Sequence, residues 1–176
     1  MTVRLLERFG VHVAARAHAH ATTFELRGPL RAPSGPIVVE PAASLAAVAL
    51  AAACLSGGEL LAPGLTCDSL QGDVAIVEHL RAFGCRAVFR SDGLLASGFP
   101  QHGARVDCGP TPDLAPVLAV TAAAATLVAD PAHATSELIG LETLPGKESS
   151  RIEVLARGLN AAGWRANATA DALTIA

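Results

Sequence analysis

The sequence predicts an α/β (α+β) fold made of repeated β-α-β-α-β-β units, and an internal repeat is the first reason. Three times an amphipathic helix runs into a glycine that is followed by an expected hairpin, in residues 5–11, 79–85 and 158–164. The glycines of the three copies lie roughly 75 residues apart, a spacing that corresponds to a whole supersecondary unit. The second and third copies belong to complete units, whereas the first is only the tail of one.

Two long apolar helices are the second reason. One is expected over residues 45–56, capped by Ser44 and ended by Gly57-Gly58, and the other over 114–128, capped by Asp113. Both are rich in alanine and lack a polar face, so we expect them to be buried all round, between sheets.

The remaining elements follow in chain order within three segments. The tail, residues 1–36, contains a helix over 2–9, strands at 11–15 and 23–26, and a Pro/Gly-rich linker. The first complete unit, 37–104, adds strands at 37–40 and 59–61, a helix over 73–83, and a hairpin of 86–90 with 94–97 around Asp92-Gly93. The second, 105–176, adds strands at 105–108 and 135–139, a helix over 148–162, and a hairpin of 165–168 with 173–175.

Composition excludes several classes of partner. Of 176 residues 51% are hydrophobic, and the formal net charge is −3 without any basic block. Nucleic acid and anionic membranes are therefore not expected partners. The apolar run 114–129 is short, alanine-rich and contains Pro116, so it predicts a buried helix and not a membrane span.

Cysteine and histidine usage indicates a reducing, cytoplasmic setting without a metal. Cys54, Cys67, Cys85 and Cys108 show no C-x-x-C spacing, which favours free thiols over disulfides or a zinc site. His18 and His20 could point to one side of a strand, but no third ligand is near them in sequence.

Asp113 is the first candidate for chemistry. It follows Pro112 at the start of an apolar helix, where a carboxylate accepts backbone N–H bonds and faces the positive end of the helix dipole. By itself this pattern is fully explained by an ordinary N-cap, which is the favoured interpretation of Asp113 taken alone.

The segment 145–151 is the second candidate. Lys147 and Arg151 stand at i and i+4 in the first turn of a helix, with Glu148 beside them. Cations are disfavoured at a helix N-terminus, so a bound phosphate or carboxylate would explain the pair; a solvated helix start is the alternative. The Gly140…Gly146-Lys147 stretch is not a P-loop, because its spacing is wrong and Glu148 replaces the Ser or Thr that coordinates magnesium.

The polar loop 69–73, Ser-Leu-Gln-Gly-Asp, is the third candidate. Ser69 or Gln71 could contact a ligand, while Asp73 favours the start of a helix; a capping loop is the alternative.

Together these stretches resemble the 5-enolpyruvylshikimate-3-phosphate synthase (3-phosphoshikimate 1-carboxyvinyltransferase) family. The matching stretches are Val39-Glu40 before an Ala-rich helix, Gly57-Gly58, residues 69–73, Pro112-Asp113, and Lys147-Glu148-Ser149-Ser150-Arg151. The resemblance implies an incomplete inside-out α/β barrel of the enolpyruvyl transferase type. It also implies transfer of a carboxyvinyl group from phosphoenolpyruvate to shikimate 3-phosphate in aromatic amino acid biosynthesis, with no metal or organic cofactor.

The resemblance assigns roles residue by residue. Asp113 corresponds to the carboxylate that contacts the shikimate hydroxyls and accepts a proton, and Arg151 to a guanidinium that grips phosphoenolpyruvate. Lys147 corresponds to a lysine near the reacting oxygens, and Glu148 to a proton-transfer group.

The sequence also departs from the family pattern. Thr143 and Pro145 stand where the family usually has Asn and Arg, Ser150 replaces an Asp, and several elements of both family domains have no counterpart. Two hypotheses therefore remain: a partial or degenerate carboxyvinyltransferase, weak or inactive alone, and a non-catalytic anion-binding or oligomerisation module. Either could act as a homo-oligomer or with a complementing domain.

Overall fold

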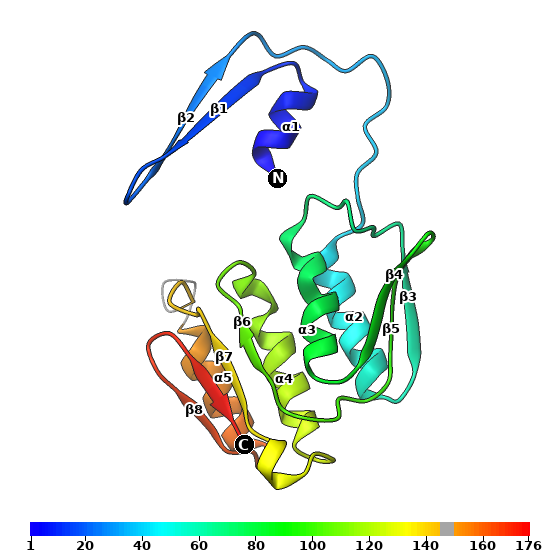
Figure 1. The fold of residues 1–176 in the computed structure, drawn as a ribbon, viewed down its shortest axis with the longest axis vertical. Helices are drawn as coiled ribbons and strands as arrows, with labels where there is room; N and C mark the ends of the chain where they lie inside the picture. Colours follow the sequence, from blue (N-terminus) through cyan, green and yellow to red (C-terminus); the bar gives the residue numbers. More distant parts are fainter. Residues whose placement is uncertain (145–149) are drawn as a thin grey trace. The chain divides into compact units, whose positions relative to one another are not determined.

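The computed structural model describes residues 1–144 and 150–176, which form two compact units, Met1–Glu40 and Pro41–Ala176 (Figure 1). Unit 1 contains the helix α1 (Thr2–Arg8) and an antiparallel hairpin of β1 (His12–Ala17) and β2 (Thr22–Arg27). This agrees with the helix and hairpin expected for the tail.

Unit 2 contains two sheets in the described part of the chain. The first has the order β3-β5-β4, formed by Glu59–Pro63, Gly93–Ser97 and Arg86–Arg90. The second has the order β6-β7-β9-β8, formed by Arg105–Asp107, Ser136–Ile139, Leu173–Ile175 and Ala166–Ala168. The β6–β7 pair is parallel and the other pairs are antiparallel.

The helices of unit 2 pack against these sheets. They are α2 (Ala43–Leu55), α3 (Ile76–Ala82), α4 (Ala115–Ala125) and α5 (Arg151–Ala161), with 3₁₀ turns η1 (Gly72–Ala75), η2 (Pro112–Leu114) and η3 (Pro131–His133). α2 packs on the first sheet, α4 packs on the second, and the two helices pack on each other. The fold is thus an incomplete inside-out α/β arrangement, as the sequence predicts.

The internal repeat is confirmed at the level of hydrogen bonds. α1, α3 and α5 each end at a glycine with positive φ, namely Gly10 (78°), Gly84 (84°) and Gly163 (100°). In each copy the next residue donates its N–H to a carbonyl five residues earlier, Val11 to Leu6, Cys85 to Leu80 and Trp164 to Leu159, at 3.0–3.1 Å. This is the Schellman motif, and in all copies a hairpin follows it.

The strand expected at 37–40 is wrong. Residues 37–40 lie in the described range without forming a strand, and Val38 and Val39 are 80% and 85% exposed. A short β-branched run becomes a strand only where another strand pairs with it. Residues 37–40 pair with no strand here, so α2 is the first regular element of the predicted repeat 37–104.

The start and the burial of α2 also differ from expectation. The helix begins at Ala43 with Ala42 as N-cap, so Ser44 lies inside the first turn and is not the cap. Leu45 and Val48 are 73% and 55% exposed, so the helix is not buried all round. The sequence of α2 has no polar face, but in the structure one side of the helix still lacks a packing partner.

The second apolar helix comes closer to its expectation. α4 is buried along nearly its whole length, with Val120 as its exposed large side chain. It begins after η2, with Leu114 as N-cap, so the expectation that Asp113 caps it is wrong. None of the helices in the described ranges has the length and hydropathy needed to cross a bilayer.

The close packing of α2 gives a stability prediction. Ala47 is 0% exposed in the core, whereas Ala52 lies on the solvent side of the same helix. We expect Ala47→Leu to lower the free energy of unfolding by about 2 kcal/mol through overpacking. Ala52→Leu is the matched control and should change it by less than about 0.5 kcal/mol. Urea unfolding of both variants measures the difference, and equal effects would contradict the assigned faces of α2.

Candidate functional site

Several helices of unit 2 begin at the same end of the unit. In Figure 1, α2, α3, α4 and α5 run in the same direction, so their N-terminal ends gather on one side. The first N–H groups of a helix lack intrahelical acceptors, and the dipole makes this end partly positive. Such an end favours anionic groups, and the polar residues of the 69–73 loop, Asp113 and Arg151 lie beside the helix starts.

Asp113 and Arg151 meet at this end. Arg151 is the first residue of α5, Asp113 lies in η2, and Arg151 Nη1 donates to Asp113 Oδ1 at 3.0 Å. Their side chains are 29% and 55% exposed, so the pair is open to solvent. The fold therefore brings together two of the predicted site residues that are 38 positions apart. The carboxylate of Asp113 serves as partner for Arg151 and not as a cap for α4.

Asp73 lies near this pair, which sequence reasoning did not anticipate. Gly72 packs against Thr111, because a Cβ on Gly72 would lie 3.3 Å from Thr111 Cγ2. This contact brings η1 beside η2. Partial burial raises the pKa of Asp73, and the negative charge of Asp113 raises it further. The site end thus holds an electrostatically linked pair of carboxyl groups.

His79 and Thr111 form a second polar contact behind these loops. His79 Nε2 lies 3.4 Å from Thr111 Oγ1, and Thr111 is 4% exposed. Burial lowers the pKa of His79, although the nearby carboxylates of Glu78 and Asp107 partly oppose the effect. Burial thus favours the neutral form of His79, and its contact with Thr111 braces the loop that carries Asp113.

Gln71 holds backbone at the start of α2. Its Oε1 accepts from Ala43 N at 2.8 Å and its Nε2 donates to Pro41 O at 2.8 Å. Gln71 N also donates to Ser69 Oγ at 3.2 Å, which fixes the loop itself. The side chain of Gln71 thereby satisfies the N–H of Ala43, the first residue of α2, which has no acceptor inside the helix. Both Ser69 and Gln71 lie at the end of unit 2 where the helices begin. Their contact with a substrate stays a prediction.

The bridge made by Gln71 leads to a second stability prediction. We expect Gln71→Ala to lower the free energy of unfolding by about 1–2 kcal/mol, because it removes a cap and leaves Pro41 O without this donor. Gln71→Glu keeps an acceptor for Ala43 N–H but loses the donor to Pro41, so its loss should be smaller. Thermal unfolding at pH 7 compares the variants, and an unchanged midpoint in Gln71→Ala would contradict the capping role.

Lys147 and Glu148 lie outside the described residues. The structure accordingly supplies geometry for Asp113, Arg151, Ser69 and Gln71, and the roles of Lys147 and Glu148 rest on the sequence.

Two of the buried cysteines, Cys85 and Cys108, are unsuited to nucleophilic chemistry. Cys54 and Cys85 lie in the core as free thiols, and a hydrogen bond between them lowers the pKa of Cys54 although burial opposes this. That bond and burial raise the pKa of Cys85, and burial raises the pKa of Cys108 to about 11. Thiols with raised pKa values stay protonated at pH 7. Within the described ranges, His, Cys, Asp and Glu side chains form no group of three or more able to hold a metal ion.

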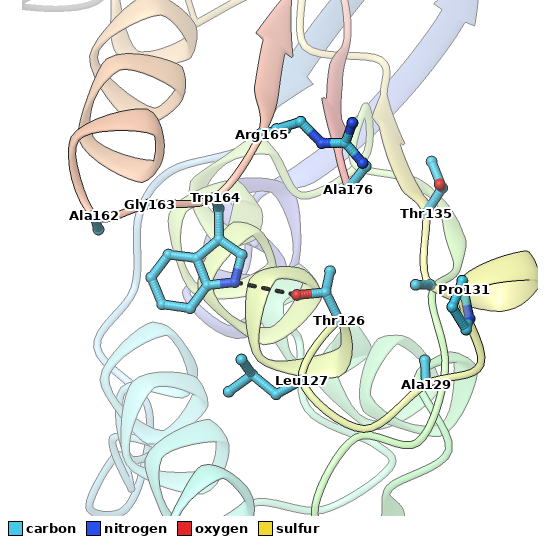
Figure 2. Close-up of a pocket in the computed structure, with 11 residues that line it drawn as sticks. Thr126, Leu127, Ala129, Pro131, Thr135, Ala162, Gly163, Trp164, Arg165 and Ala176 are labelled. Carbon is cyan, nitrogen blue, oxygen red and sulfur yellow. Dashed lines mark hydrogen bonds between the residues drawn. The ribbon is translucent and has the colours of Figure 1, made fainter.

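A separate hollow lies beyond the other end of α4. It has a volume of about 500 Å³ and is lined by residues that include Thr126, Trp164 and Arg165. Figure 2 shows the indole N–H of Trp164 donating to Thr126 Oγ1, a bond of 3.2 Å. Asp113 precedes α4 and Thr126 follows it, so the helix separates them by about 17 Å at 1.5 Å per residue. This hollow is not part of the candidate site.

Comparison with known proteins decides the family. The sequence pattern of the family EPSP synthase (3-phosphoshikimate 1-carboxyvinyltransferase) matches residues 1–176, the whole chain. The chain belongs to the EPSP synthase family. This confirms the resemblance drawn from the motif residues.

Curated relatives of the EPSP synthase family are considerably longer than this chain. The 3-phosphoshikimate 1-carboxyvinyltransferase of Methanosphaerula palustris is 33% identical over 176 residues, covering 99% of this chain and 39% of the relative. That of Nitrosomonas europaea is 35% identical over 179 residues, with the same coverage of 99% and 39%. The chain therefore spans about two fifths of the length of these relatives.

Solved structures show the same fold. EPSP synthase from Acinetobacter baumannii superposes with a TM-score of 0.72 at 22% identity, covering 98% of this chain and 39% of that one. The enolpyruvyl transferase NikO from Streptomyces tendae gives a TM-score of 0.62 at 15% identity, covering 98% and 38%. At these identities the likeness concerns the fold alone.

Proposed function

We propose that the helix-start end of unit 2 is the part of an enolpyruvyl transferase site that this chain carries. The observation that supports the proposal most is the Asp113–Arg151 pair, which joins two sequence-predicted residues across 38 positions at the N-terminal ends of α4 and α5. The substrates would be phosphoenolpyruvate and shikimate 3-phosphate, both anionic, and the N-terminal ends of α4 and α5 favour anions there.

The proposed roles follow the chemistry of the transfer. The 5-hydroxyl oxygen of shikimate 3-phosphate attacks C2 of phosphoenolpyruvate while C3 takes up a proton, and the tetrahedral intermediate then loses phosphate and a C3 proton. Asp113 would orient the shikimate hydroxyls and accept the proton of the attacking one. Arg151 would hold phosphoenolpyruvate through charge-assisted hydrogen bonds.

The two residues outside the described ranges complete the proposed set. Lys147 would stabilise negative charge on the reacting oxygens, and Glu148 would carry the proton to and from C3. Ser69 and Gln71 would contact the substrate or fix the loop beside it. Catalysis of this kind depends on several positioned charges, so we expect the 176-residue chain alone to bind substrate and turn it over weakly.

A non-catalytic anion-binding module is the second candidate. The chain has Thr143, Pro145 and Ser150 where the EPSP synthase family usually has Asn, Arg and Asp. These substitutions favour the non-catalytic module. Both candidate functions bind an anion through the same charged side chains. Only the transferase would also release phosphate. The free thiols Cys54 and Cys85 fit a cytoplasmic location for either one.

Calorimetric titration with both substrates, combined with a phosphate-release assay on the same samples, tests the proposal. We expect binding of shikimate 3-phosphate and phosphoenolpyruvate with little or no release of phosphate. Rapid release would show a working transferase and contradict the expected weakness of the chain alone. If titration of the folded chain gave no heat signal and no competition between ligands at any substrate concentration, the proposed site would be ruled out.

A further inference from the structure

Asp113 lies on a short loop whose buried residues fix its backbone. The loop follows β6 and runs from Cys108 to Leu114, which are 0% and 1% exposed. Cys108 N donates to Ile139 O at 2.9 Å, and Leu114 N donates to Thr111 O at 3.0 Å. Asp113 itself is exposed. The place of its carboxylate therefore depends on how the buried residues on either side of it are held.

Thr111 is the polar residue among these buried ones. It is 4% exposed, and a Cβ on Gly72 would lie 3.3 Å from its Cγ2, so η1 packs against its methyl group. Its hydroxyl oxygen lies 3.4 Å from His79 Nε2. A buried hydroxyl that loses its partner destabilises the conformation that buries it. His79 thus stabilises the conformation in which Thr111 is buried and Asp113 faces solvent.

His79 is well placed to hold the loop. Ile76 and Leu80, which precede and follow it in α3, are 1% and 0% exposed, so the helix that carries the imidazole is anchored in the core. A neutral imidazole has one donor and one acceptor nitrogen, and a hydroxyl both donates and accepts. Either tautomer of His79 can therefore satisfy the hydroxyl of Thr111.

We propose that His79 is a positioning residue of the candidate site, which acts through Thr111 to set where the Asp113 carboxylate meets a hydroxyl-bearing substrate. The contacts run from His79 Nε2 to Thr111 Oγ1 and from Thr111 O to Leu114 N, and Asp113 lies between Thr111 and Leu114. The inference rests on the proposed function, because it takes Asp113 as the group that contacts the substrate hydroxyls. It adds a residue that the sequence analysis did not single out for the site.

Paired substitutions separate this hydrogen bond from the packing around it. Thr111→Val removes the hydroxyl but keeps a methyl group against Gly72, and His79→Leu removes the partner nitrogen. His79→Gln returns an amide nitrogen near the position of Nε2, so it should keep the contact. Thr126→Val is the matched control, because it deletes a hydroxyl that accepts from Trp164 Nε1 at 3.2 Å beyond the other end of α4.

Calorimetric titration with shikimate 3-phosphate measures the effect on the site. We expect Thr111→Val and His79→Leu each to weaken binding about 3- to 10-fold, the loss that follows removal of one neutral hydrogen bond. The double variant should bind no more weakly than the singles, because both changes remove the same contact. His79→Gln and Thr126→Val should stay within about twofold of the wild-type chain. Unchanged affinity in Thr111→Val and His79→Leu, or equal losses in His79→Leu and His79→Gln, would overturn the proposal.

Amide hydrogen exchange without substrate separates this proposal from the proposed function. Thr111→Val and His79→Leu should speed exchange of the Leu114 N–H, which bonds to Thr111 O, at least about threefold, while exchange in β5 stays unchanged. Thr126→Val should leave exchange at Leu114 as it is. Exchange at Leu114 that is the same in all variants would overturn the positioning role of His79. If exchange responds as expected but the wild-type chain binds no substrate, the proposed function is wrong and His79 holds the loop alone.

Discussion

Arg151→Ala should lower the affinity of the chain for phosphoenolpyruvate about 10- to 100-fold. A hydrogen bond to a charged group contributes about 1.5–3 kcal/mol, and each 1.4 kcal/mol corresponds to a factor of ten in affinity. Arg151 is held at the site end by Asp113, 3.0 Å away, so its charge is already placed where the anion would bind. Isothermal titration with phosphoenolpyruvate measures the effect.

Arg157→Ala is the control for this experiment. Arg157 lies on the same helix, α5, and is exposed. It is six residues after Arg151. Its removal therefore deletes the same charge as Arg151→Ala, but away from the site. Its effect on affinity should stay below about threefold, as expected for a charge screened by solvent. Arg151→Lys keeps the charge but loses the planar fork, so we expect an intermediate loss. Equal losses in Arg151→Ala and Arg157→Ala would contradict the proposed role of Arg151.

Gly93→Ala should lower the free energy of unfolding by about 3 kcal/mol or prevent folding altogether. Gly93 opens β5, the central strand of the first sheet, with φ of +154°. A Cβ there would lie 2.3 Å from Ala62 O and 2.8 Å from Pro63 Cα. These are backbone atoms of β3, so relief of the clash requires the strands to move apart.

Gly158→Ala is the matched control for the change at Gly93. Gly158 lies inside α5, and a Cβ there would have open space around it within 4 Å. Replacing a helix-interior glycine by alanine stabilises by up to about 1 kcal/mol. Denaturant unfolding should therefore give shifts of opposite sign for the two variants. A stable Gly93→Ala protein with unchanged cooperativity would contradict the close approach of β3 and β5.

Local signals in the sequence predicted much of the fold. Gly10, Gly84 and Gly163 each mark a helix end and the hairpin after it, because the Schellman motif is built from adjacent residues. The hairpin at Asp92-Gly93 was found for the same reason. Signals that depend on a distant partner were less reliable. The run 37–40 resembles a strand in composition, but pairing is decided by residues far along the chain.

The candidate site shows the same division. Sequence singled out Asp113 and Arg151 separately, but whether Asp113 caps α4 or pairs with Arg151 depends on where α5 begins. The sequence predicts Asp73 at a helix start, whereas its proximity to Asp113 arises from the contact of Gly72 with Thr111. The sequence suggests a ligand contact for Gln71. In the structure its side chain instead hydrogen-bonds to the backbone of Pro41 and Ala43, about 30 residues earlier in the chain. Such tertiary contacts leave no periodic pattern in the sequence.

Amide hydrogen exchange with and without both substrates tests the central claim most directly. The chain should gain protection in the 69–73 loop, in η2 around Asp113 and at the start of α5, because these segments would surround the bound anions. The hollow beside Trp164, beyond the other end of α4, should stay unchanged and serves as an internal control. Protection confined to that hollow, or exchange unaffected by saturating substrate, would contradict the placement of the site at the helix-start end of unit 2.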